Sequence, residues 1–102
     1  MQINKTDNYS FGKITADKSV RKAITNMLGA EEASFVKRFE EGWNACKNTE
    51  FADLLITKGR EVYVVGKESK NMKKMKSFNS FIHNIYNGIQ HVIFAEENKF
   101  RY

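Results

Sequence analysis

The chain has no proline and a single cysteine, Cys46, among its 102 residues. One cysteine cannot form an internal disulfide, so nothing in the sequence points to an oxidising compartment. No segment approaches the roughly 20 consecutive apolar residues that a transmembrane helix needs, and the first residues carry no apolar signal-peptide core. We therefore expect a cytoplasmic protein that is neither secreted nor inserted in a membrane.

Patterns for the common catalytic and cofactor chemistries are also missing. The six glycines form neither of the phosphate-binding patterns G-x-x-x-x-G-K-[ST] and G-x-G-x-x-G. His83 and His91 have no second cysteine to complete a zinc site, and Cys46 lies in an apolar stripe typical of an unreactive buried thiol. We predict no catalytic site, no metal and no cofactor, hence no enzyme. A small enzyme that depends on these three residues is the alternative.

What the chain does contain is enough apolar material for one small core. Hydrophobic residues make up 41% of the sequence, aromatic residues 13% and charged residues 28%, which is close to the globular average. Neither a linker nor an internal repeat divides it, so residues 1–102 are predicted to form a single domain. The abundance of Lys, Asn, Phe and Tyr is typical of AT-rich coding and of small phage or mobile-element proteins.

Apolar periodicity predicts a strand and two helices in the first half of the chain. Tyr9 and Phe11 alternate with small residues, which indicates a strand over residues 8–14. A helix is expected to begin at Asp17 or Ser19 and to end at Gly29, where glycine can adopt the left-handed conformation that closes a helix. A second helix should follow the acidic pair at 31 and 32 at once. Its apolar stripe consists of Phe35, Phe39, Trp43 and Cys46.

In the second half of the chain the apolar periodicity changes from that of a helix to that of a strand, and then returns to that of a helix. The apolar runs 54–57 and 61–65 are joined by Lys58-Gly59-Arg60, which predicts a hairpin. A third helix is expected over residues 71–86, then a turn at Asn87-Gly88 and a last strand over 89–95. The fold class is therefore α+β, with about three helices packed on an antiparallel sheet that contains the central hairpin.

Charge is unevenly distributed, because residues 58–76 carry the whole net charge of +5. Within this basic segment the candidate nucleic-acid-binding residues are Lys58, Arg60, Lys67, Lys70, Lys73, Lys74 and Lys76. Lys70, Lys73 and Lys74 would share one flank of the predicted third helix. Tyr63, beside the basic tip of the hairpin, is a candidate for stacking on unpaired bases, as are Phe81 and Tyr86, although core positions suit all three aromatics.

Lysines without nearby acids favour contact with phosphates, because counterion release then contributes to affinity. The leading hypothesis is a non-enzymatic small regulator or inhibitor that binds nucleic acid, RNA or DNA, or a nucleoprotein through the basic segment. Lysine binds phosphate as a point charge, so recognition should be weakly sequence-specific. The alternative is a protein-interaction inhibitor or structural protein that docks on an acidic partner surface. Lysines that serve only solubility would explain the same charge.

Overall fold

The apolar runs on either side of Lys58-Gly59-Arg60 form the hairpin that the sequence predicts. β2 (Ala52–Ile56) pairs antiparallel with β3 (Val62–Gly66). Buried and half-buried residues alternate along both strands, because successive side chains of a strand point to opposite faces of the sheet. One face of the hairpin therefore forms one side of the hydrophobic core. These strands belong to a computed structural model that describes residues 14–77 and 79–102.

Two short strands extend the hairpin into a four-stranded sheet of order β1-β2-β3-β4. β1 (Ile14–Ala16) pairs with β2 in parallel, and β4 (Met72–Lys74) pairs with β3 antiparallel. The sheet is thus mixed, and the expectation of an antiparallel sheet was wrong at β1. Two helices separate β1 from β2, and a connection of that length can bring the chain back in the same direction. The strand predicted over residues 8–14 lies outside the described residues except for Ile14.

The first helix has the predicted boundaries. α1 (Lys18–Leu28) is capped by Asp17, whose carboxylate accepts hydrogen bonds from the backbone amides of Ser19 and Val20 at 3.0 and 3.2 Å. This satisfies amides that have no partner inside the helix. Gly29 ends the helix as predicted, but its φ of −61° is right-handed. The expectation of a left-handed closing residue was therefore wrong.

The second helix follows the acidic pair as expected. α2 (Ala33–Cys46) has Glu32 at its N-cap position, without a side-chain hydrogen bond to the helix. The predicted apolar stripe faces the core, with Phe39 and Cys46 buried and Phe35 and Trp43 half-buried against them. The periodicity of the segment therefore predicted both the helix and the side that it buries.

The last third of the chain differs from the prediction. Residues 72–74 form β4 rather than a helix, and the helix α3 (Phe81–Glu97) runs without interruption through Asn87-Gly88 and the predicted strand 89–95. Gly88 serves close packing rather than a turn, since a Cβ there would lie 2.7 Å from side-chain atoms of β2 and β3. No helix in the described part of the chain is long and apolar enough to cross a bilayer.

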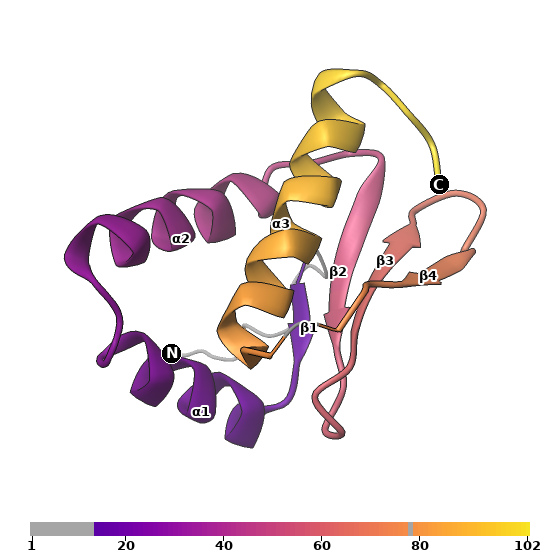
Figure 1. Cartoon of the computed structure of the whole chain (residues 1–102). Helices are drawn as coiled ribbons and strands as arrows, with labels where there is room; N and C mark the ends of the chain where they lie inside the picture. The colour runs from indigo at the N-terminus through magenta and orange to yellow at the C-terminus, as the bar shows by residue number, and fades with distance from the viewer. Residues whose placement is uncertain (1–13, 78) are drawn as a thin grey trace, which may run out of the picture.

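All three helices contribute to one core on one face of the sheet. Figure 1 shows α3 across the front of the sheet, with α1 and α2 beyond it on the side away from β4. The core joins Val20 and Ile24 of α1, Phe39 of α2 and the buried face of α3 to the inner residues of the hairpin. This arrangement leaves β4 as an outer strand of the sheet, opposite β1.

Candidate nucleic-acid interface

The two cations at the tip of the hairpin each have a partner. Lys58 is 81% exposed at its side chain, and its Nζ lies 3.5 Å from Asp17 Oδ2. The Arg60 guanidinium lies over the ring of Phe81, 5.3 Å from its centre, a cation–π arrangement. An exposed ion pair of this kind contributes little free energy, so Lys58 can exchange its partner at small cost.

Two further lysines of the basic segment pair with carboxylates beside the hairpin. Lys67 Nζ lies 3.0 Å from Asp53 Oδ1, and both side chains are largely buried. Lys74 Nζ lies 3.1 Å from Glu61 Oε2, while the hydroxyl of Tyr63, opposite Lys74 in the sheet, donates to Glu61 Oε1 at 3.2 Å. The hydrogen bonds from Lys74 and Tyr63 lower the pKa of the Glu61 carboxyl. Tyr63 is thus half-buried and held by Glu61 rather than freely presented.

The remaining lysines of the segment follow the outer edge of the sheet. Lys70 lies in the turn before β4, Lys73 lies within β4, and Lys76 follows two residues after it. No carboxylate within the described ranges lies at ion-pair distance from these three ammonium groups. We call Lys70, Lys73 and Lys76 the edge lysines. The helical flank predicted for Lys70, Lys73 and Lys74 was wrong, because this stretch is a turn and a strand.

Successive side chains of a strand point to opposite faces of the sheet, so β4 places Lys73 and Lys74 on different faces. Lys74 lies on the outer face of the sheet with Tyr63, whereas Lys73 lies opposite Val64, whose side chain is buried under the helices. Two acids that neutralise part of the segment, Asp17 and Asp53, lie outside it in sequence. Counting charge along the chain therefore overstated how many of the cations are free.

One of the edge lysines, Lys70, has an unusual backbone conformation. Lys70 has a φ of 64°, a left-handed conformation that side chains other than those of glycine and asparagine rarely adopt. Lysine on a short outer strand also discourages pairing with another sheet. The edge lysines therefore have both a binding interpretation and a protective one.

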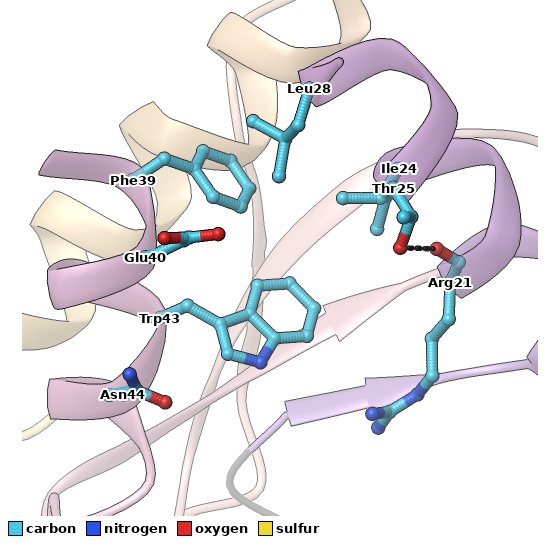
Figure 2. A pocket seen from close by; sticks show the side chains of 8 residues that line it. All are labelled: Arg21, Ile24, Thr25, Leu28, Phe39, Glu40, Trp43 and Asn44. Carbon is cyan, nitrogen blue, oxygen red and sulfur yellow. Dashed lines mark hydrogen bonds between the residues drawn. The ribbon is translucent and has the colours of Figure 1, made fainter. Parts of the chain in front are cut away.

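A separate cleft lies between α1 and α2, with a volume of about 410 Å³. Ile24 and Leu28 of α1 and Phe39 and Trp43 of α2 line it, and Figure 2 shows Leu28, Phe39 and Trp43 directed into the same space. Arg21 closes one end. Its guanidinium donates to the β1 carbonyl oxygens at 3.0 and 3.1 Å and lies 5.9 Å from the indole ring. The apolar periodicity of both helices predicted that these residues lie in the core. The sequence did not predict that the two helices leave a cleft between them.

The histidines lie in different surroundings on α3. His83 Nε2 is 4.0 Å from Glu31 Oε1, and its ring meets that of Phe35 edge to face. His91 Nδ1 lies 3.1 Å from the hydroxyl oxygen of Tyr102. The strand position expected for His91 was wrong. In the part of the chain that the structure describes, no three His, Cys, Asp or Glu side chains come close enough to hold a metal ion.

The cysteine belongs to the core, as predicted. Cys46 has no exposed surface, and its Sγ lies 3.9 Å from the carbonyl oxygen of Ile89. Burial raises the pKa of the thiol to about 12. A thiolate nucleophile is therefore disfavoured at this position.

The half-buried aromatics singled out from sequence pack mainly inward. Phe81 and Tyr86 both lie against the core cluster, so neither is a free platform for bases. The structure thus places the three edge lysines along the turn, strand and chain at the outer edge of the sheet, and it pairs Lys58, Lys67 and Lys74 with carboxylates. Comparison of the chain with protein-family models, with curated proteins and with solved structures found no match in any of the three.

Proposed function

We propose that this protein is a non-enzymatic binding module that occupies a site on nucleic acid, or on a nucleoprotein, and so acts as a small regulator or inhibitor. The observation that carries the proposal is the position of the edge lysines. They follow one outer strand, and no described carboxylate pairs with them. Three unneutralised cations along one edge suit the repeating charge of a phosphate backbone.

The same contacts bear on how the binding would work. Arg60, which lies over Phe81, also has no carboxylate partner among the described residues. The edge lysines present ammonium groups, which lack the planar fork that reads guanine. Affinity should therefore depend on backbone phosphates and on salt, with weak sequence preference.

The test compares two variants that lose the same charge. One replaces the edge lysines with glutamine (Lys70→Gln, Lys73→Gln and Lys76→Gln). The control changes three exposed lysines on α1 and α2, the helices that Figure 1 shows on the side away from β4 (Lys18→Gln, Lys22→Gln and Lys37→Gln). Binding of labelled oligonucleotides is measured by fluorescence anisotropy at several salt concentrations.

Wild-type protein and the helix variant should bind with a slope of about −2 to −4 in log affinity against log salt, as expected for about three or four phosphate contacts. The edge variant should lose most of this slope. Equal losses in both variants would mean that net charge alone attracts the nucleic acid. A slope near zero for the wild type would contradict the proposal and leave protection of the sheet edge as the role of these lysines.

The cleft between α1 and α2 favours a second candidate, a protein-interaction inhibitor. Its apolar lining can receive aliphatic or aromatic side chains of a partner, while the net charge of +5 attracts an acidic partner to the molecule. Thr25→Arg would place a charged chain in this cleft, and Asn26→Arg on the same helix is the matched control outside the lining. A partner that is captured after nuclease treatment and lost only with Thr25→Arg would favour this function over nucleic-acid binding.

A further inference from the structure

A groove of about 640 Å³ lies between α3 and the outer edge of the sheet. α3 and β4 bound its two sides, and the chain after α3 runs back toward the turn before β4, as Figure 1 shows. One of the edge lysines, Lys73, lines the groove. Other lining residues are Asn87, Gln90, His91, Phe94 and Phe100. The groove thus joins the basic edge to polar and aromatic side chains that no sequence pattern had connected with it.

The side of α3 that faces the groove differs from the side that faces the core. Positions 87, 90, 91 and 94 recur with the helical period and carry two amides, an imidazole and a phenyl ring. Ile85, Ile89 and Val92 lie on the other side and are fully buried on the sheet. β4 is only three residues long and lies beyond the strands on which the core side of α3 packs, so the polar stripe borders an open space.

The residues after α3 form one wall of the groove. Lys99 has a left-handed φ of 51°, and the Phe100 amide donates to the Ala95 carbonyl at 2.8 Å, so the chain reverses sharply. The turn brings the Tyr102 hydroxyl to 3.1 Å from His91 Nδ1. The rings of Phe100 and Tyr102 meet edge to face with centres 5.3 Å apart. This wall is therefore aromatic and is held by contacts with α3.

Two aromatic rings of the groove are unusually accessible. Phe94 is 55% exposed and Phe100 is 51% exposed. Isolated exposed apolar residues are common on proteins, but here both rings line the same groove as an ammonium group without a described carboxylate partner. Flat aromatic faces beside a cation are what proteins use to hold unpaired bases, because the ring stacks on the base while the cation meets the phosphate.

We infer that this groove binds one unpaired nucleotide of a single-stranded nucleic acid. Phe94 stacks on the base and Lys73 contacts the flanking phosphate. The Asn87 amide nitrogen donates to Met75 Sδ at 3.9 Å, so its amide oxygen is the group that accepts a hydrogen bond from the base edge. Glu97, the last residue of α3, also lines the groove, and its carboxylate disfavours a phosphate at that end. The strand would therefore enter with its phosphate toward Lys73. This inference rests on the proposed function and narrows it to single strands.

A duplex cannot use the groove in the same way. Its bases are stacked on each other and paired, so neither a base face nor a base edge is available to Phe94 and Asn87. Duplexes should bind only through phosphates along the edge. The expected signature is a preference for single strands that depends on an aromatic ring at position 94.

The experiment measures anisotropy of a labelled ten-nucleotide oligouridylate, the matching oligodeoxythymidylate and a duplex of equal length. Phe94→Leu removes the aromatic ring but keeps an apolar side chain, and Phe94→Tyr restores the ring. Met72→Leu is the control, because Met72 is equally exposed but lies outside the groove. Thermal unfolding by circular dichroism checks that each variant is folded.

Phe94→Leu should weaken binding of the single strands about tenfold, leave duplex binding and the salt slope unchanged, and be rescued by Phe94→Tyr. Lys73→Gln should instead reduce the salt slope by about one. Equal affinity of wild type for single strand and duplex, with no effect of Phe94→Leu, would overturn the groove assignment while the edge-lysine proposal stands.

Two other results would also overturn the inference. Absence of any salt-dependent binding would remove both the groove assignment and the proposed function. Conversion of a dimer to a monomer by Phe94→Leu in sedimentation, without a change in oligonucleotide affinity, would assign the exposed rings to self-association.

Discussion

Gly42 of α2 lies so close to Ile89 of α3 that a Cβ on Gly42 would fall 2.7 Å from Ile89 Cγ2. A real Cβ cannot occupy that position unless the Ile89 side chain or one of the helices shifts. This contact sets how closely α2 approaches α3, and it explains why a glycine is placed in the middle of a helix despite its poor helix propensity.

Gly42→Ala should therefore destabilise the protein by about 1 to 2 kcal/mol, because overpacking outweighs the gain in helix propensity. Gly29→Ala is the control. Gly29 has a right-handed φ of −61°, and a Cβ there would make only ordinary contacts. Urea unfolding of both variants measures the difference, and a Gly42→Ala variant more stable than wild type would show that the gain in helix propensity exceeds the cost of the closer contact.

Lys70→Gly should raise the free energy of unfolding by up to about 1 kcal/mol, since glycine adopts the left-handed conformation of Lys70 without steric penalty. The same change should weaken nucleic-acid binding, because it removes an edge lysine. Lys76→Gly is the matched control, as Lys76 has no positive φ, and it should lose both stability and binding. A lower free energy of unfolding in Lys70→Gly would contradict the prediction that the backbone at Lys70 is strained.

Cys46 should resist alkylation by iodoacetamide at pH 8 in the folded protein. With the thiol pKa raised to about 12, only on the order of one thiol in ten thousand is ionised at that pH, and the side chain has no exposed surface. Mass spectrometry should detect complete modification once the protein is unfolded in guanidinium. Rapid labelling under native conditions would indicate that the α2–α3 contact opens readily.

Stability should decline in acid because two carboxyl groups titrate at lower pH in the folded state. The hydrogen bonds from Ser19 and the Val20 amide, with Lys58 nearby, lower the pKa of Asp17 from 3.8, and Lys74 and Tyr63 lower that of Glu61 from 4.5. A depressed folded-state pKa contributes stability that is complete above the ordinary value and is lost as the pH falls through the lowered one.

Unfolding by urea between pH 6 and pH 2 would measure this loss. The double variant Asp17→Asn and Glu61→Gln should show a flatter dependence, since neither amide titrates and asparagine still caps the helix. An identical pH dependence in both proteins would assign the acid sensitivity to other carboxyl groups.

Local patterns predicted α1, α2 and the hairpin well. The carboxylate at position 17, the stripe from Phe35 to Cys46 and the β-branched runs around Gly59 each act within a few residues, so their physical effect is visible in sequence. The error in α3 came from reading Asn87-Gly88 as a turn. Those residues remain helical because Gly88 lets the helix pack directly on Leu54 and Val62, a contact between segments far apart in the chain.

The candidate interface was only partly predictable for the same reason. Sequence located the surplus of lysine in residues 58–76. It did not show that Asp17 and Asp53 neutralise Lys58 and Lys67, or that Phe94 and Phe100 line a groove with Lys73. Each of these pairings depends on the way the strands and α3 are brought together.

The sequence by itself determined the class of the fold, two of the helices, the central hairpin and the location of the excess positive charge. These depend on periodicity, capping and composition, which act locally. Only the tertiary structure decided that the third helix extends to Glu97, that β4 becomes an outer strand, and which lysines lack a described carboxylate partner. Burial on the sheet favours one long helix, and ion pairing depends on distance in space, so neither outcome is encoded within a short window of residues.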